Sequence, residues 1–508
     1  MSEQHPHVNP WIVAVAVMFS TFMEVLDTTV VNVSLPHIAG DLSVTINEAT
    51  WALTSYLVAN AIILPITGWL ATYFGRKRLL MMSVIGFTTA SFLCGFAPTL
   101  PFLIVCRILQ GAAGGCLQPL SQAVLLEAFP PQDRGKAMGF WGLGIVVAPV
   151  LGPVLGGWLT DSYSWRWVFY INIPVGIISL LMTNEFVFDP PYLRRVRASI
   201  DYWGIGFLAI WIGALQIMLD KGEQEDWFGS PMIVTLAVLT VIFFVGFLVR
   251  ELTAEHPVVD LTVFKKRTYA TGVFLMTIVG FVLYGSLVLL PVWIQTLLGY
   301  PALAAGMALA PRGMGSMLGM PLVGAIMPKT DPRRFLAAGL CLGAATLYQF
   351  STLNLNTGYW NLFWPQFIQG FGLAMLFVPL TTITMSPISR ERMGNATSIF
   401  NLTRNMGGSI GIAVVETMQA RFSQKHINYL GAHVTPFDTQ ANQMLSALTS
   451  RLGERPALAS MWGLVQAQAA MLSFIDVFRI LAVMFLVLVP LLLIMKRPAK
   501  GAAAEIAH

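Results

Sequence analysis

Long apolar stretches, separated by short polar segments, follow one another along nearly the whole chain of 508 residues. A helix that crosses a bilayer needs about 20 mostly apolar residues, and fourteen stretches come close to that length. We expect helical spans at residues 11–35, 49–71, 79–96, 102–123, 137–159, 166–184, 202–219, 231–249, 270–291, 302–326, 335–351, 361–384, 397–420 and 475–495. The pattern predicts an all-α polytopic membrane protein.

The composition supports this prediction. Hydrophobic residues make up 56% of the chain and charged residues 11%, whereas a soluble domain carries about 25% charged residues. The net charge of +5 comes from basic residues in short clusters between apolar stretches, so we expect no nucleic-acid partner. The four cysteines lie in apolar stretches without the spacing of metal ligands, so neither a disulfide framework nor a metal site is expected.

Basic residues also predict the orientation of the chain in the membrane. Of the 30 Lys and Arg residues, 20 fall in loops on the side that carries both termini, and six fall on the other side. Because basic loops stay in the cytoplasm, we expect both termini to be cytoplasmic. The long polar segment 421–474 is then a periplasmic loop.

Two parts of the sequence resemble each other. "PITGWLATYFGRKRLL" (Pro65–Leu80) matches "PLVGAIMPKTDPRRFL" (Pro321–Leu336), and "RILQG" (Arg107–Gly111) matches "QFIQG" (Gln366–Gly370). Both offsets equal eight predicted spans, although chance matching in apolar sequence is an alternative. Parallel repeats of this kind build transporters. The prediction is a 6+2+6 arrangement with a six-helix half at 1–184, two inserted helices and their loops at 185–269, and a second six-helix half at 270–508.

Two carboxylates interrupt the first apolar stretch. At 100° per residue, Glu24 and Asp27 share one helix face with Ser20, Val31 and Ser34. A charge at the centre of a bilayer costs about 2.5–3.5 kcal/mol on insertion scales, so an acid in that place usually has a function. We expect this face to line a central cavity and both acids to take part in proton coupling. Either acid could instead only pair with a neighbouring helix.

Arg107 is the predicted partner of Asp27. Both residues lie roughly 8–12 Å from the outer ends of their predicted spans, at 1.5 Å per residue. The other half has Gln366 in place of Arg107, so the repeat does not need the charge, which favours a role in proton coupling. A buried arginine that binds backbone carbonyls and ties helices together is the alternative.

The second half contains its own charged residues. Arg312 lies mid-span beside small residues and should have an acidic or carbonyl partner. Glu416 is expected to bind a cationic substrate or a proton, or else to pair with Arg312 or Arg404. The polar residues that we expect to line a substrate cavity are Gln110, Gln118, Arg312, Gln366 and Gln369.

Four segments resemble the signature motifs of the major facilitator superfamily: "LDTTVVNVSLP", "GWLATYFGRKR", "RILQGAAGG" and "APVLGPVLGGWL". The first and last, with fourteen spans, resemble the drug:proton antiporter branch of the EmrB and QacA type. This resemblance implies a functional role for Asp27, an antiporter motif at Gly152, Pro153, Gly156 and Gly157, and a conformational loop motif at Gly68, Gly75, Arg76 and Lys77. The chain departs from the pattern at Ala148, where glycine is usual, and at Thr72, where aspartate is common.

The resemblance implies a proton-driven antiporter of the bacterial inner membrane that exports lipophilic compounds, cations among them. A periplasmic adaptor protein and an outer-membrane channel are the partners that it implies. The chain has no GxxxxGK[ST] or HExxH motif, so we expect no enzyme and no cofactor, with the proton gradient as the energy source. An uptake symporter, or a receptor or scaffold that transports nothing, remains an alternative.

The predicted periplasmic loop contains an amphipathic segment. In "QMLSALTSRL", Met444, Leu445, Leu448 and Leu452 share one helical face. A helix on the membrane surface, a docking site and packing of this face within the loop itself are all consistent with the pattern.

Overall fold

The structure is a computed structural model that describes residues 9–130, 132–189, 201–255, 257–327, 330–435 and 437–494. Helices dominate these ranges, and no strand occurs in them. Some basic residues that enter the predicted orientation lie outside the described residues: Arg194, Arg195, Arg197, Lys329, Lys496, Arg497 and Lys500.

The first part of the chain forms nine helices, which we call the N-terminal set. They are α1 (Pro10–Asp41), α2 (Ile46–Ala49), α3 (Trp51–Phe74), α4 (Arg76–Gly95), α5 (Leu100–Gly114), α6 (Leu117–Ala128), α7 (Arg134–Ser162), α8 (Trp167–Tyr170) and α9 (Asn172–Phe186). Two long helices follow, each with a short 3-10 helix after it. These are α10 (Tyr202–Lys221), η1 (Trp227–Gly229), α11 (Pro231–Thr253) and η2 (Leu261–Lys265).

The last part of the chain forms the C-terminal set. Its elements are α12 (Arg267–Thr296), α13 (Ala302–Ile326), α14 (Pro332–Phe350), α15 (Tyr359–Met385), η4 (Arg390–Arg392), α16 (Met393–His433), α17 (Thr439–Leu452), α18 (Glu454–Leu488) and η5 (Pro490–Ile494).

Every predicted span coincides with a helix or with a pair of helices. The spans predicted at 102–123 and 166–184 are each broken, into α5 and α6 and into α8 and α9. Within the described residues, eleven helices or joined helix pairs are long and apolar enough to cross a membrane. The other three long helices, α13, α14 and α16, are interrupted by polar or basic residues, so the count of fourteen spans stays a prediction.

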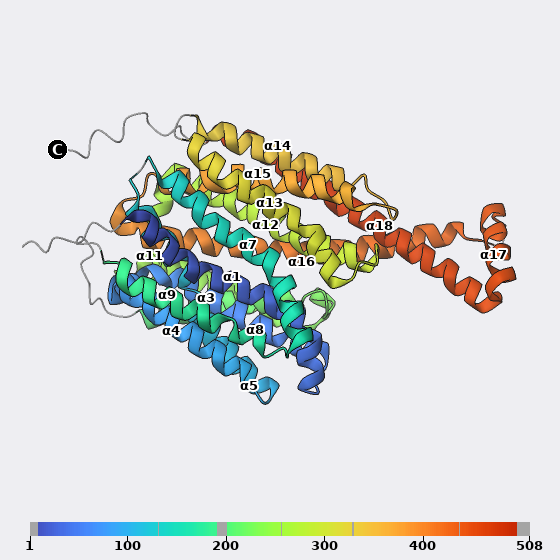
Figure 1. Cartoon of the computed structure of the whole chain (residues 1–508), viewed down its shortest axis with the longest axis horizontal. Helices are drawn as coiled ribbons and strands as arrows, with labels where there is room; N and C mark the ends of the chain where they lie inside the picture. Colours follow the sequence, from blue (N-terminus) through green and yellow to red (C-terminus); the bar gives the residue numbers. More distant parts are fainter. Residues whose placement is uncertain are drawn as a thin grey trace, which may run out of the picture.

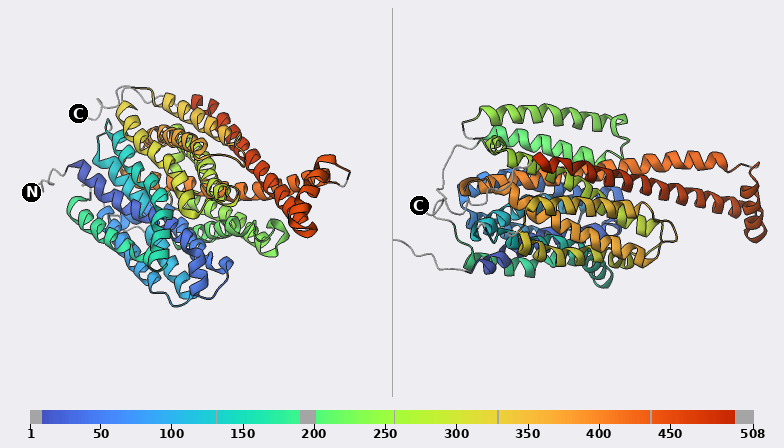
Figure 2. Two further views of the ribbon diagram at one scale, coloured as in Figure 1. Left: turned by 45° about the vertical axis from the view of Figure 1, so that its right-hand side comes forward. Right: turned by 90° about the horizontal axis from the view of Figure 1, so that it is seen from above.

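The helices lie roughly along one direction in two groups (Figures 1 and 2). In the N-terminal set, α1 packs against α6, α7 and α9, while α5 packs against α3 and α4. In the C-terminal set, α12 packs against α16, and α15 packs against α13 and α14. The sets meet where α7 contacts α13 and where α3 and α6 contact α16, and α10 contacts both α3 and α16.

Glycines allow the two sets to touch at one end of the bundle, which we call the inner end; it is where α1 and α16 begin and α3 ends. A Cβ added to Gly68 of α3 would lie 2.6 Å from Cα of Asn395 on α16. A Cβ added to Gly324 of α13 would lie 2.8 Å from the carbonyl oxygen of Gly135 on α7. Gly68 and Gly324 are equivalent positions of the sequence repeat, so equivalent glycines make equivalent contacts between the sets.

The last long helices extend beyond the rest of the bundle at its other end (Figures 1 and 2). α16 has 41 residues and α18 has 35 residues, so both are much longer than the spans predicted at 397–420 and 475–495. The segment 421–474 is therefore a helical hairpin rather than an irregular loop, with α17 at its tip. Near its base, Nε2 of His426 lies 2.9 Å from Oδ2 of Asp476.

Candidate functional site

A buried ion pair joins α1 to α5 at the predicted position. Nη1 of Arg107 donates to Oδ2 of Asp27 at 2.6 Å, and both side chains have no exposed surface. Nε of Arg107 donates to the carbonyl oxygen of Ala52 at 2.9 Å, so the arginine also makes the backbone contact that was the alternative. The ring of Tyr56 lies 4.2 Å from the guanidinium carbon, where its face attracts a cation.

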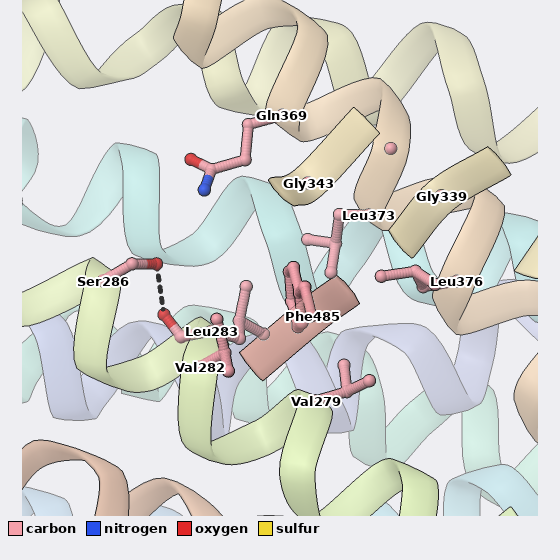
Figure 3. A pocket seen from close by; sticks show the side chains of 11 residues that line it. Val279, Val282, Leu283, Ser286, Gly339, Gly343, Gln369, Leu373, Leu376 and Phe485 are labelled. Carbon is pink, nitrogen blue, oxygen red and sulfur yellow. Dashed lines mark hydrogen bonds between the residues drawn. The ribbon is translucent and has the colours of Figure 1, made fainter. Parts of the chain in front are cut away.

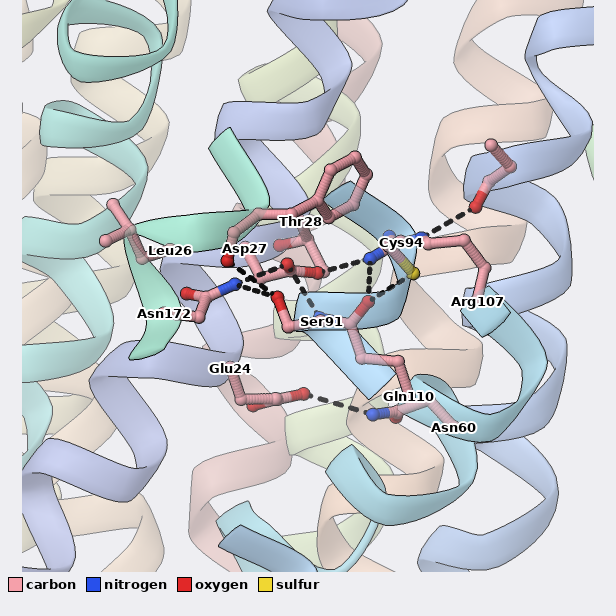
Figure 4. Close-up of polar contacts among 12 residues, drawn as sticks. Glu24, Leu26, Asp27, Thr28, Asn60, Ser91, Cys94, Arg107, Gln110 and Asn172 are labelled. Carbon is pink, nitrogen blue, oxygen red and sulfur yellow. Dashed lines mark hydrogen bonds and ion pairs between the residues drawn. The ribbon is translucent and has the colours of Figure 1, made fainter. Parts of the chain in front are cut away.

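Two amide side chains complete the environment of Asp27 (Figure 4). Oδ1 of Asp27 accepts from Nε2 of Gln110 at 2.9 Å and from Nδ2 of Asn172 at 2.8 Å. Gln110 also accepts from Arg107 at 2.8 Å, and Asn172 donates to Ser91 at 3.0 Å. The carboxylate thus accepts from three donors on α5 and α9, as a buried charge requires. Asn172 was not predicted; the only signal is one amide within an apolar stretch.

The polar face of α1 does not line an open central cavity, contrary to the prediction. All five of its side chains are buried. Ser20 lies 2.7 Å from Ser179 of α9, and Ser34 lies 2.8 Å from Thr160 of α7, each measured between hydroxyl oxygens. Neighbouring helices of the N-terminal set supply these partners, so Ser20 and Ser34 form their hydrogen bonds inside this set. Periodicity places residues on a face but does not say what that face meets.

Glu24 lies where the two sets of helices meet. Its carboxylate accepts from Nδ2 of Asn60 at 3.2 Å and from Nε2 of Gln118 at 2.6 Å. Oε1 of Gln118 accepts in turn from Nη2 of Arg404 on α16 at 2.5 Å. Glu24, Gln118 and Arg404 are each at most 7% exposed. A chain of two hydrogen bonds therefore links the carboxylate of α1 to a cation of the C-terminal set.

Further bonds between the sets follow toward the inner end. Nδ2 of Asn401 donates to Oε1 of Gln122 at 2.6 Å, and Oγ1 of Thr397 donates to the carbonyl oxygen of Pro119 at 3.1 Å. Thr397, Asn401 and Arg404 follow one another at helical spacing. That spacing of polar residues in an apolar stretch was the sequence signal for this contact, and it was missed.

Arg312 joins two of the predicted cavity residues. Its Nε donates to Oε1 of Gln366 at 2.9 Å, and its Nη2 donates to Oε1 of Gln369 at 2.5 Å. The expected partner was an acid or a carbonyl, and the structure has side-chain carbonyls. The arginine is 8% exposed, and Nε2 of Gln366 is buried without a hydrogen-bond partner.

Glu416 is not paired with either arginine named in the alternative. Arg312 binds Gln366 and Gln369, and Arg404 binds Gln118 and Asn405. Glu416 lies on an exposed part of α16 and faces two further carboxylates, Asp220 and Glu223. The alternative of an ion pair is wrong because α16 extends outward past the depth at which the arginines lie.

A small apolar cavity borders Gln369 (Figure 3). It lies between α12, α14, α15 and α18, with Gly339, Gly343 and the ring of Phe485 in its wall. Its volume is about 20 Å³, which is enough for about one water molecule. In this conformation the cavity is a packing gap rather than a place for a drug-sized molecule.

The predicted loop motif surrounds the inner end of α3. Gly75 has a positive φ of 87° and links α3 to α4. Arg76 forms an ion pair with Glu127 of α6, and its Nη2 donates to the carbonyl oxygen of Arg390 at 3.4 Å. The backbone nitrogen of Lys77 donates to Asp189 at 2.9 Å. Thr72 donates to the carbonyl oxygen of Gly68 in its own helix, so a neutral bond stands at this departure from the pattern.

The predicted antiporter motif presses α7 against α1. A Cβ on Gly152 would lie 2.0 Å from Oγ1 of Thr29, and a Cβ on Gly156 would lie 2.9 Å from the carbonyl oxygen of Val30. Pro153 lies inside the helix, and Gly157 has open space beside it. Gly152 and Gly156 are thus the members of the motif that make the close contact.

A bundle of apolar helices with charged side chains buried in its interior is typical of integral membrane proteins that transport a substrate or an ion. Within the described residues, no group of His, Cys, Asp or Glu could hold a metal ion.

Comparison with known proteins identifies the family. The family model described as "Major Facilitator Superfamily" matches residues 17–412. The chain is 40% identical over 490 residues to "Multidrug export protein EmrB" of Escherichia coli (strain K12), covering 96% of this chain and 95% of that protein. It is 39% identical over 488 residues to "Fatty acid resistance protein FarB" of Neisseria gonorrhoeae, covering 96% of each.

The fold is also that of a solved structure. The crystal structure of the human organic anion transporter MFSD10 (TETRAN) matches with a TM-score of 0.59 and 13% identity, covering 95% of this chain and all of that chain. The chain belongs to the major facilitator superfamily, and within it to the EmrB-like group of multidrug export proteins.

Proposed function

We propose that this protein is a proton-driven antiporter of the bacterial inner membrane that exports lipophilic compounds, with fourteen spans and both termini in the cytoplasm. The observation that carries the proposal is the carboxylate of Asp27, which is fully buried and bound by Arg107, Gln110 and Asn172. A buried carboxylate can bind and release protons when its surroundings change. Arg107 responds to this change, because protonation of Asp27 removes the counter-charge of the guanidinium and deprotonation restores it.

The two sets of helices, together with their intervening loops, are proposed to rock against each other. In the described residues, the side-chain hydrogen bonds that join the two sets are found in the part of the bundle that runs from Arg404 to the inner end. With the inner end in the cytoplasm, this is a state that is closed on the cytoplasmic side. Protons from the periplasm would then reach the carboxylates of α1 before the inner end opens.

A second proposal concerns the charge of the substrate. Carboxylates such as Glu416 favour cations, as the sequence also predicts. Arg312 adds a cation that is held by neutral amides only, and neither α13 nor α15, which packs against it, carries an acidic residue. The name of the relative FarB refers to fatty acid resistance. We propose that lipophilic anions are also substrates.

The helical hairpin of α16, α17 and α18 is the proposed contact for a periplasmic adaptor, which would connect the protein to an outer-membrane channel. The hairpin extends beyond the bundle, and no side chain of α17 is buried. Met444 and Leu452 on its predicted apolar face are 46% and 51% exposed. Exposed apolar residues at the tip of a projecting element are typical of a protein interface.

The decisive experiment measures proton movement in proteoliposomes when a lipophilic substrate is added. Asp27→Asn should abolish substrate-driven proton exchange, because asparagine keeps the size of the side chain but cannot carry a proton. There are two controls. One is liposomes that receive substrate but contain no protein, and the other is proteoliposomes with the variant Asn356→Asp, which lies in an exposed loop. Proton exchange at the wild-type level in Asp27→Asn would refute the coupling role. Movement of protons and substrate in the same direction would indicate a symporter, and no movement at all would favour a receptor or scaffold.

A further inference from the structure

The hydrogen-bond chain from Glu24 to Arg404 crosses between the two sets of helices through one side chain. Gln118 of α6 donates to Glu24 at 2.6 Å and accepts from Arg404 at 2.5 Å. An ionised carboxylate can only accept hydrogen bonds, and a guanidinium can only donate them. The amide of Gln118 therefore has a single orientation that satisfies both neighbours, with its NH₂ toward Glu24 and its oxygen toward Arg404.

We propose that Gln118 is a relay that makes contact between the two sets at the inner end depend on the ionisation of Glu24. This inference rests on the proposed function and deepens it, because it assigns Gln118 and Arg404 as positioning residues for proton coupling. Asp27 is then the more deeply enclosed carboxylate, and Glu24 is the one connected to the moving contact.

The chemistry of the carboxyl group explains the dependence. A protonated Glu24 keeps a carbonyl oxygen that can accept, but it can also donate its O–H, so its bond to Gln118 loses the charge and no longer fixes the NH₂ of Gln118 toward it. If the amide turns, its NH₂ faces Arg404, where two donors cannot bind each other. The attraction between the carboxylate and the guanidinium is lost at the same time. Proton uptake by Glu24 therefore weakens the bond that holds α6 to α16.

The surroundings of Glu24 leave Arg404 as the responsive partner. The charged or titratable groups that face Glu24 are Asp27 on its own helix, Arg404 from α16 and Tyr56 from α3. Asp27 is already paired with Arg107. The other helices packed against α1 carry their charged residues near their ends; these are Glu48 of α2, Glu127 of α6, Arg134, Lys136 and Asp161 of α7, and Glu185 of α9.

The direction of this relay agrees with antiport. The closed inner contact requires ionised Glu24, and protonation from the outer side releases it. Gln122 with Asn401 and Thr397 with Pro119 are the next bonds toward the inner end, so loss of the Gln118 bond opens the contact from its outermost layer. A protein that has taken up a proton can then open inward, release it and bind a substrate.

A distance measurement across the inner end tests the relay without substrate and without a proton gradient. Spin labels are attached at Arg78→Cys on α4 and Arg334→Cys on α14, which are both exposed. The exposed Cys341 is replaced by Ser, while the other three cysteines are buried. In the purified full-length protein, acidification should increase the population with the longer distance, by about tenfold if the bridge has the strength of a charged hydrogen bond.

Variants separate the relay from general damage. Glu24→Gln should populate the longer distance at every pH, and Gln118→Ala should abolish the pH response. Arg404→Gln should behave as Gln118→Ala does, while Arg404→Lys keeps a donor and a charge and should restore part of the response. Asn60→Ala is the matched control, because Asn60 binds Glu24 but not the C-terminal set. It should retain the pH response.

A wild-type pH response in Gln118→Ala, or equal loss of the response in Asn60→Ala, would overturn the relay. The proposed function fails separately. If the distances follow these expectations but proteoliposomes show no substrate-driven proton exchange, the relay stands and antiport does not. If exchange occurs and Gln118→Ala changes neither the distance nor the exchange, antiport stands and the relay is wrong.

Discussion

Arg107 makes contacts that only an arginine can make at once. Its Nη1 binds both Asp27 and Gln110, and its Nε binds the backbone of Ala52. A planar group with donors on several sides fits this arrangement, whereas lysine offers one charged nitrogen on a flexible stem. The residue therefore has two functions in one place, since it balances the charge of Asp27 and ties α5 to α3.

This dual contact predicts different results for two substitutions. Arg107→Gln leaves a buried carboxylate without its cation, a change that typically destabilises a protein by about 3–5 kcal/mol, and it should shift the pH optimum of transport. Arg107→Lys keeps the charge and should retain more activity and a pH optimum nearer to the wild type. Transport measured over a pH series in proteoliposomes, with thermal unfolding of each variant, checks both statements. The same pH profile in wild type and both variants would argue against the pairing as a coupling element.

Arg312 predicts a change in substrate preference. Arg312→Gln removes the buried cation that only Gln366 and Gln369 bind. Export of dodecanoate should fall by about tenfold, the usual effect of losing one charged hydrogen bond. Export of dodecyltrimethylammonium, which has the same chain length and the opposite charge, should change little. Arg312→Lys is the matched variant that keeps the charge. Equal losses for both compounds would assign Arg312 to structure rather than to substrate binding.

At the scale of helices, glycines decide how closely the two sets approach. Gly68 has no room for a Cβ, which would lie 2.6 Å from the backbone of Asn395. On the opposite surface of the same contact, a Cβ at Gly394 would be 3.7 Å from Cα of Gly68, which is an ordinary distance. The contact therefore requires a glycine at position 68 but not at position 394.

Gly68→Ala should therefore open the inner end, and Gly394→Ala should not. Overpacking of this kind costs about 1–3 kcal/mol, and here the cost falls on the closed contact. The spin-label pair at positions 78 and 334 measures the change, since the population with the longer distance should rise in Gly68→Ala only. If both variants leave the distance unchanged, or both change it equally, the close approach of Gly68 does not control the contact.

For the whole molecule, the projecting hairpin separates transport from assembly. The hairpin can be shortened at its base, where His426 and Asp476 lie side by side, by replacing residues 427–475 with a short Gly/Ser linker. Proteoliposome transport should remain largely intact, because Asp27 and Glu24 lie far from the hairpin within the bundle. Drug resistance of cells should be lost, because export would stop in the periplasm.

A subtler variant tests the tip alone. Met444→Ser with Leu452→Ser keeps the length of the hairpin and removes exposed apolar surface from α17. It should reduce resistance in cells and leave proteoliposome transport unchanged. A fall in both assays would assign the hairpin to the transport core. If neither variant alters resistance, the proposal of an adaptor contact is wrong.

The sequence alone determined the features that depend on local pattern. Runs of apolar residues located part or all of every long helix, because a helix that crosses a bilayer needs about 20 mostly apolar residues. Glu24, Asp27 and Arg107 were recognised because charges are rare in such runs. The pairing of Asp27 with Arg107 was predicted from their similar depth, and the repeat at Gly68 and Gly324 was visible as matching letters.

Only the tertiary structure decided what each polar face meets. The chain from Glu24 through Gln118 to Arg404 joins residues that are 94 and 286 positions apart, and no local periodicity carries such a relation. The sequence likewise did not reveal Asn172 as a partner of Asp27, the buried position of the α1 face or the separation of Glu416 from the arginines. Glutamine and asparagine can donate or accept, so their partners depend on which charged group the fold brings beside them.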